Sequence, residues 1–278
     1  MEAFDTNEYH VTLFGHGNRI VFIPEKAGSA ERISEMVGQD IVIAALDGVD
    51  WNNDLTPWRA PGLRSGEFGD GAEKFLRALT GDVIPMTLER LSVEEYELYL
   101  AGYSLAGLFA VWAATRTDIF AGVASVSGSL WYDGFIDYLT GARLIVPEIY
   151  FSVGEAESRT RSQRLSGVVD MTSSAYNIAK GQKIDTTMRL NPGGHFSEPE
   201  KRCADAVRWL TGDKATKRKD DYKWHCSHRP PGAHRTSCRQ KQSNGRSWKR
   251  LCVRKPTCKA SGKYAPLCLS IQSSFCAA

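Results

Sequence analysis

Residues 98–110 read LYLAGYSLAGLFA, which is a short apolar run, a serine between small residues, and then apolar positions at helical spacing. This order predicts a strand, a sharp turn at Ser104 and a helix. Small residues two positions before and after the serine let strand and helix pass close together, and Gly102 and Ala106 occupy those positions. Glycine is more common at the second position, so Ala106 keeps the small size but gives up some backbone freedom. Ser104 is therefore a candidate nucleophile, with an ordinary serine in a strand-to-helix turn as the alternative.

The serine lies in a segment where strand-like and helix-like patterns alternate. Short runs rich in β-branched and aromatic residues predict strands at 19–24, 40–46, 97–101, 122–127, 148–153 and 185–190. Helical spacing of apolar residues occurs at 30–37, 71–79, 105–115, 164–179 and 199–210. Near-continuous apolar strands suit a sheet that is covered on both faces. We therefore predict an α/β domain over residues 1–212, with a mostly parallel sheet flanked by helices.

Charge and cysteine content change after position 212. The 278-residue chain has a net charge of +3, but residues 213–278 hold sixteen Lys or Arg against three Asp or Glu, whereas the preceding residues hold nineteen against twenty-nine. Six of the seven cysteines also follow position 212. Low apolar content without periodicity predicts that the basic tail at 213–278 is disordered. Nucleic-acid binding by this tail is the weaker alternative, because no nucleic-acid motif or zinc-finger spacing is recognisable there.

The sequence contains no run of about 18 apolar residues, so it predicts no membrane span. The first residues, MEAFDTNE, lack the basic and apolar regions of a signal peptide. We therefore expect a cytoplasmic protein that does not interact with a membrane.

A serine attacks a carbonyl efficiently when a base removes its proton and a carboxylate orients that base. His195 is the candidate base, since it follows two glycines just after the last predicted strand. The candidate acid is Glu157, three residues after the glycine that ends the strand at 148–153, with Glu155 as the alternative. A Ser-His dyad that makes little use of either glutamate is a further alternative. The order serine, acid, histidine is that of α/β-hydrolases, and each residue follows the carboxyl end of a strand, where ligands bind in such sheets.

An oxyanion hole requires two backbone N–H groups aimed at the developing negative charge. The N–H of Leu105, directly after the serine, is expected to be one donor. The other should come from the loop after the strand at 19–24, and Glu25 and Lys26 are the candidates.

Five segments together resemble the esterase D, or putative esterase, group of the α/β-hydrolase superfamily, which includes enterochelin (siderophore) esterases and S-formylglutathione hydrolases. They are DWNNDLTPW at 50–58, AGYSLAGLFA at 101–110, SVSGSLW at 125–131, FSVGEAE at 151–157 and GGHF at 193–196. The chain is most similar to uncharacterised bacterial members related to the siderophore-esterase branch. The resemblance covers about residues 5–212 and implies an α/β-hydrolase fold. It also implies Ser104 as nucleophile, His195 as base, and Glu157 or Glu155 as acid. Two departures are Ala106 in the turn and the missing His-Gly after Pro24, and both bear on the oxyanion hole.

Aromatic residues near the expected sheet edge are candidate substrate contacts. They are Trp51 and Trp58 in the loop at 50–58, Tyr103 beside the serine, and Trp131 in the loop after the strand at 122–127. A cap in which the tryptophans only fill gaps is the alternative for the first loop.

These observations predict a serine carboxylic-ester hydrolase that forms an acyl-enzyme with a small-molecule ester and requires no metal or organic cofactor. One alternative is an acyltransferase, in which an alcohol replaces water on the same residues. The other is a non-catalytic binding protein that keeps the fold. Neither the substrate nor the oligomeric state follows from the sequence.

Overall fold

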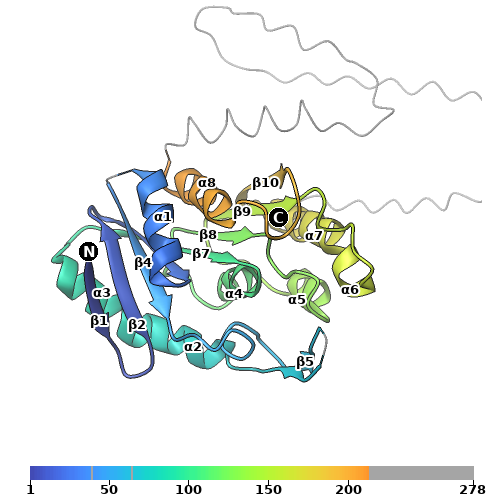
Figure 1. The fold of residues 1–278 in the computed structure, drawn as a ribbon, viewed down its shortest axis with the longest axis horizontal. Coiled ribbons are helices and arrows are strands. Elements are labelled where there is room, and N and C mark those ends of the chain that lie inside the picture. The colour runs from blue at the N-terminus through green and yellow to red at the C-terminus, as the bar shows by residue number, and fades with distance from the viewer. Residues whose placement is uncertain (39, 64, 213–278) are drawn as a thin grey trace, which may run out of the picture. The chain divides into compact units, whose positions relative to one another are not determined.

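The computed structural model describes residues 1–38, 40–63 and 65–212 (Figure 1). The predictions made for the basic tail, residues 213–278, lie outside the described residues. None of the described helices is both long enough and apolar enough to cross a membrane.

Eight strands form one sheet in the order β1-β2-β4-β3-β7-β8-β9-β10. They are β1 (Glu2–Asp5), β2 (His10–Gly15), β3 (Arg19–Pro24), β4 (Ile41–Asp47), β7 (Glu97–Tyr103), β8 (Gly122–Val126), β9 (Glu148–Gly154) and β10 (Asp185–Asn191). All pairs from β4 to β10 are parallel, whereas β2 pairs antiparallel with β4 and β1 pairs antiparallel with β2. The predicted mostly parallel sheet is confirmed, and each of the six expected strands is present.

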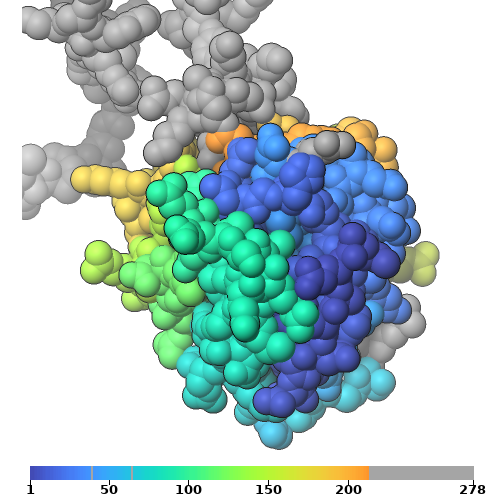
Figure 2. Space-filling view, turned by 90° about the vertical axis from the view of Figure 1, so that its left-hand side faces the viewer, coloured from blue at the N-terminus to red at the C-terminus, as the bar shows by residue number. Residues whose placement is uncertain are grey.

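Two of the eight strands were not expected from the sequence. β1 has four residues and buries only Phe4, so it carries no apolar run. β2 is an antiparallel strand that begins with exposed His10 and ends with exposed Gly15. Figure 2 shows α3 (Ile84–Leu91) beside β1 at this edge of the sheet. The Arg90 guanidinium of this helix lies 4.5 Å from the centre of the Phe4 ring.

Helices cover both faces of the sheet (Figure 1). The elements besides α3 are α1 (Ala27–Val37), α2 (Ala72–Ala78), a π-helical turn (Leu79–Val83), α4 (Leu105–Ala113), α5 (Phe135–Gly141), α6 (Gln163–Ser166), α7 (Val168–Gly181) and α8 (Pro199–Thr211), with a short pair β5 (Ala60–Pro61) and β6 (Glu67–Phe68). Successive strand residues point to opposite faces. Val21 and Ile23 of β3 therefore pack with α1 and α8, whereas Ile20 and Phe22 pack with the helices of the other face.

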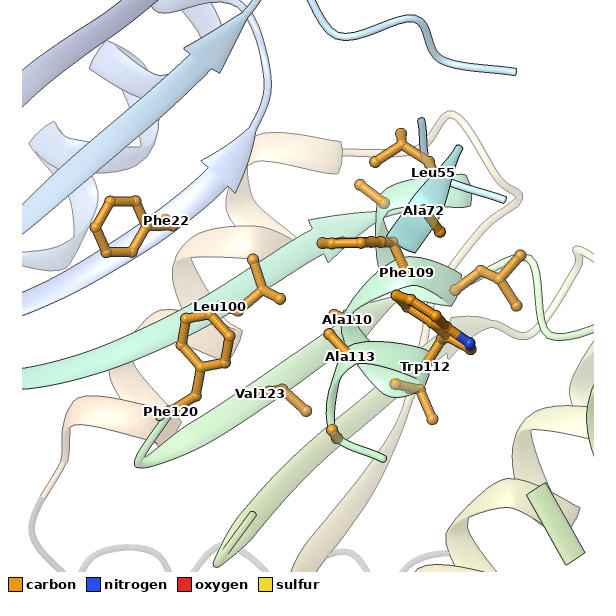
Figure 3. Packing of buried hydrophobic residues seen from close by; sticks show 14 of the residues in the cluster. Phe22, Leu55, Ala72, Leu100, Phe109, Ala110, Trp112, Ala113, Phe120 and Val123 are labelled. Carbon is orange, nitrogen blue, oxygen red and sulfur yellow. The ribbon is translucent and has the colours of Figure 1, made fainter. Parts of the chain in front are cut away.

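Helix α4, which follows the candidate nucleophile, lies inside the core. All nine of its residues are buried. Figure 3 shows Ala110 and Ala113 of this helix near Leu100 and Val123 of the strands, so small side chains allow the helix to approach the sheet closely. The start of α4 is thereby held at a fixed place relative to the end of β7.

Candidate active site

Ser104 occupies a strained turn between β7 and α4. Its backbone angles, φ 57° and ψ −119°, are unusual for a residue with a side chain. Several backbone hydrogen bonds hold this conformation. The Ser104 N–H donates to the Val126 carbonyl at 3.1 Å, and the Ser104 carbonyl accepts from the N–H groups of Gly107, Leu108 and Ser129. The turn therefore presents the serine side chain at the carboxyl edge of the sheet.

Close packing of the backbone explains why the residues around the serine are small. A Cβ atom added to Gly102 would lie 2.1 Å from the carbonyl oxygen of Ala106, well inside contact distance. Position 102 therefore requires glycine. Ala106 is fully buried, so its methyl group is accommodated in the core.

Three side chains from three loops form one hydrogen-bonded chain. The Ser104 Oγ lies 3.2 Å from Nε2 of His195, and the Nδ1 of His195 lies 2.8 Å from Oε2 of Glu157. These residues follow β7, β10 and β9, so the topology of the sheet brings together positions that are 91 and 38 residues apart. With Nδ1–H donating to the carboxylate, Nε2 is free to accept the serine proton.

The two candidate acids occupy different environments. Glu155 is exposed, and its backbone N–H donates to the Asn191 carbonyl. The side chain of Glu157 is 3% exposed. Burial by itself raises the pKa of Glu157, but hydrogen bonds from His195, the Gly154 N–H and Ser127 outweigh it and hold the pKa below its ordinary value. Only Glu157 of the two contacts His195.

Arg202 of α8 is a neighbour of Glu157 that the sequence reasoning missed. Its guanidinium lies 3.2 Å from Oε1 of Glu157 and 3.0 Å from the Oγ of Ser127, and it donates to the Pro192 carbonyl at 2.7 Å. An arginine near the start of a helix is ordinarily solvated. The available signal was its spacing from Ala206 and Trp209, which places it on the buried face of α8.

A cavity of about 280 Å³ adjoins the hydrogen-bonded chain. Its wall consists of Ser104, Ser129, Glu157 and His195 together with the apolar side chains of Leu63, Trp131, Leu165, Val168 and Phe196. Ser129 contacts the candidate nucleophile, with 3.3 Å between the two hydroxyl oxygens. Phe196 is 88% exposed and Leu63 is 49% exposed, which is unusual for large apolar side chains.

The candidate oxyanion donors differ in how they are bonded. Leu105 is the first residue of α4, where N–H groups have no acceptor within the helix. The Glu25 N–H donates to the Leu46 carbonyl at 3.2 Å and so extends the pairing of β3 with β4. The Lys26 N–H donates to the side chain of Glu25 at 3.0 Å. Both donors of this loop are therefore already hydrogen-bonded.

The four aromatic candidates lie in different places. Trp131 lines the cavity beside Ser104. Tyr103 is not among the residues that line this cavity, and its ring centre lies 5.2 Å from that of His195. Trp51 lines a separate pocket with Glu25 and Lys26. Trp58 packs against Tyr132, Phe135 and Tyr138, and its Nε1 donates to the Asp133 carbonyl, so it does not line the cavity beside Ser104.

Within the described ranges, no group of three or more His, Cys, Asp or Glu side chains is arranged to hold a metal ion.

Comparison with solved structures identifies proteins of the same fold. The siderophore hydrolase EstB from Aspergillus nidulans has a TM-score of 0.61 and 17% identity, over 75% of this chain and 94% of that one. An IroE-like serine hydrolase from Shewanella oneidensis has a TM-score of 0.64 and 13% identity, over 80% and 85% of the two chains. The enterobactin and salmochelin hydrolase IroE has a TM-score of 0.55 and 18% identity, over 76% and 94%. At such identities these likenesses show the fold alone.

A search of curated proteins found no match. The model of the family described as "Putative esterase" matches residues 5–196, which is more than half of the chain. This match confirms the resemblance seen in the sequence. The chain belongs to this esterase family and is a carboxylic ester hydrolase with the α/β-hydrolase fold.

Proposed function

We propose that this esterase acts through an acyl-enzyme on Ser104, with His195 as general base and Glu157 as the carboxylate that orients the histidine. The hydrogen-bonded chain from Ser104 through His195 to Glu157, next to an apolar cavity, is the observation that carries the proposal. This arrangement of nucleophile, base and orienting acid recurs on unrelated folds, so the geometry supports the roles independently of the family.

In the first half-reaction the Ser104 oxygen attacks the ester carbonyl carbon while its proton passes to Nε2 of His195. The negative charge that develops on the carbonyl oxygen is stabilised by backbone N–H groups. When the tetrahedral intermediate collapses, His195 returns the proton to the departing alcohol. Water then attacks the acyl-enzyme with His195 again as base, which releases the carboxylic acid and restores the Ser104 hydroxyl.

The Leu105 N–H and the Lys26 N–H are the oxyanion donors in this proposal. Lys26 is preferred over Glu25 because its N–H is bonded to a side chain, which can rotate away, whereas the Glu25 N–H is part of the sheet pairing.

The cavity favours a neutral, apolar acyl group. No Lys or Arg is among the described residues that line it, so a charged acyl group would lose hydration without gaining a partner. Two of the structurally similar proteins are a siderophore hydrolase and an enterobactin and salmochelin hydrolase, so siderophore esters belong in a substrate panel as a comparison.

Hydrolysis of p-nitrophenyl acetate, butyrate, hexanoate and monosuccinate tests this proposal. We expect kcat/KM to rise about fourfold for each added methylene until the cavity is filled. The succinate monoester should be at least about tenfold slower than the butyrate. Equal rates across the panel, or a preference for succinate, would contradict the acyl-group assignment.

Substitutions in the site, compared with matched substitutions away from it, test which side chains the reaction requires. Ser104→Ala should reduce hydrolysis to background, whereas Ser174→Ala, on the outer side of α7, should keep the wild-type rate. Phe196→Ala should lower kcat/KM most for the longest ester. Ile119→Ala removes another exposed apolar side chain, away from the cavity, and should have no such effect.

A further inference from the structure

The guanidinium of Arg202 lies where the acid loop and the histidine loop meet. Its side chain is 4% exposed, so it is a buried cation rather than a surface charge. One terminal nitrogen, Nη1, contacts both Oε1 of Glu157 and the Oγ of Ser127. The other, Nη2, donates to the carbonyl of Pro192, three residues before His195. One side chain thus connects α8 with the loops that follow β8, β9 and β10.

The two oxygens of Glu157 have separate partners. Oε1 accepts from the Gly154 N–H at 2.6 Å, from Ser127 at 2.8 Å and from Arg202 at 3.2 Å. Within the described part of the chain, Oε2 has His195 as its one hydrogen-bond partner. The carboxylate is therefore anchored through one oxygen, and its orientation leaves the other aimed at the imidazole.

We propose that Arg202 is a positioning residue for this reaction: it fixes Glu157 and the start of the histidine loop, and its charge balances that of the carboxylate facing His195. This inference rests on the roles proposed above for Ser104, His195 and Glu157. Arg202 does not touch the cavity, so it acts only through these residues.

The charge balance has a kinetic consequence. With Arg202 present, the carboxylate that faces the imidazole is already paired with a cation, which limits how strongly it favours the imidazolium form. Without Arg202 the same buried carboxylate has no cation, so the histidine becomes protonated more readily and the base is lost at a higher pH. The acid limb of the pH profile of kcat/KM reports this change.

Other titratable or charged groups near Glu157 and Arg202 do not obscure the acid limb of the pH profile. Burial raises the pKa of Tyr103 to about 12, and burial raises the pKa of the Cys203 thiol as well, so both are neutral between pH 5 and 9. Glu200, at the start of α8, is partly buried and paired with Arg32, whose hydrogen bond holds the pKa of Glu200 below its ordinary value, so it stays charged over this range. The other charged side chains on the acid loop and beside the start of α8 are exposed, and salt screens them: Glu155, Arg159, Arg161, Glu198 and Lys201.

Arg202→Met removes both the charge and the hydrogen bonds. We expect kcat/KM at pH 8 to fall at least about tenfold, and the midpoint of the acid limb to move up by about one pH unit. Arg202→Lys keeps the charge but cannot reach three acceptors with a planar fork. It should keep the wild-type midpoint and recover only part of the rate.

Arg208→Met is the matched control, because Arg208 lies on the same helix and also bonds a carbonyl and a carboxylate, those of Met36 and Asp205. It should leave the rate and the midpoint unchanged. Titration with diethyl p-nitrophenyl phosphate counts the competent sites in each preparation, so a partly unfolded variant does not mimic a slower one.

A double-mutant cycle tests whether Arg202 acts through Glu157. In the Glu157→Gln background Arg202→Met still releases the Pro192 carbonyl, so it should lower kcat/KM, but by a smaller factor than in the wild type. An unchanged midpoint in Arg202→Met, or a full additional loss in the Glu157→Gln background, would overturn the inference and leave Arg202 with a structural role alone. Ser104→Ala, assayed in parallel, distinguishes the two proposals: if it remains active, the proposed function fails first.

Discussion

In the proposed mechanism, the reactivity of Ser104 depends on its strained backbone as well as on the neighbouring side chains. A positive φ at a serine is costly, and hydrogen bonds from both sides of the turn hold it in place. In the proposed mechanism His195 is the base and Glu157 orients it. The same residue-scale geometry distinguishes the two glutamates, because one is buried beside the imidazole and the other is exposed.

Replacement of the two glutamates by glutamine tests this distinction. Glu157→Gln keeps the size but removes the charge that orients and stabilises the imidazolium, so kcat/KM should fall at least about 100-fold. Glu155→Gln, two residues away in the same loop, should stay within about twofold of the wild type. Ester hydrolysis by the purified variants measures both, and the reverse pattern would assign the acid role to Glu155.

Glu157 also predicts how stability depends on pH. Because folding lowers the pKa of this carboxyl, its ionised form stabilises the native state above the unfolded pKa of about 4.3, and that contribution is lost as the pH falls through the lower native value. The wild type should therefore lose more unfolding free energy between pH 6 and 3 than Glu157→Gln, which has no such proton to gain. Urea unfolding across this range measures the difference. Identical pH dependence in both proteins would contradict the lowered pKa.

At the scale of elements, the strand–turn–helix unit of β7 and α4 positions Ser104, the proposed nucleophile. The turn works because the backbone of α4 passes directly over Gly102, and because small residues let the helix lie close to the sheet. Because this unit needs an apolar strand, small residues at the turn and a helix, the sequence around Ser104 predicts it clearly.

Gly102→Ala tests this close approach. Its methyl group would meet backbone atoms of Ala106, which cannot rotate away, so the free energy of unfolding should fall by about 3 kcal/mol or more. Gly181→Ala is the control: it lies at the end of α7 with no atom within 4 Å of the added Cβ, and should be neutral or stabilising by about 0.5–1 kcal/mol. Similar losses in both variants, measured by urea unfolding, would mean that the elbow has no special steric demand.

The packing of helices and loops on one another limits what the sequence alone predicts. Ser104 and His195 are readable because each directly follows a strand run, and strand ends gather at one edge of a parallel sheet. The sequence did not predict Arg202 as a site residue, because its burial depends on how α8 packs over the sheet. Trp58 shows the opposite case, since its aromatic loop suggested a substrate contact, whereas packing against three rings places it away from the cavity.

At the scale of the whole molecule, the described residues contain both hydrophobic clusters, the complete sheet and the hydrogen-bonded chain. The fold class was predictable because strand and helix patterns alternate along the chain. The antiparallel strands β1 and β2 were not, because their short, partly exposed segments lack the apolar run of a central strand.

The domain boundary predicted at residue 212 can be tested with a shortened chain. Residues 1–212 include Thr211, whose carbonyl accepts a hydrogen bond from Arg19, so α8 stays tied to β3. We expect this fragment to fold cooperatively and to hydrolyse p-nitrophenyl butyrate within about twofold of the full chain, because the full set of site residues is present. Thermal unfolding and kcat/KM measure the two properties. A fragment that folds but loses activity would show that residues 213–278 contribute to the site.

Covalent labelling of the nucleophile tests the central claim most directly. Diethyl p-nitrophenyl phosphate reacts with an activated serine, releases p-nitrophenolate and leaves a stable phosphoryl adduct. The account predicts one adduct per chain, located by peptide mass spectrometry on Ser104, with loss of esterase activity in proportion to labelling and little labelling of His195→Ala. Loss of activity with the adduct on another residue, or full labelling of Ser104 with activity retained, would contradict it.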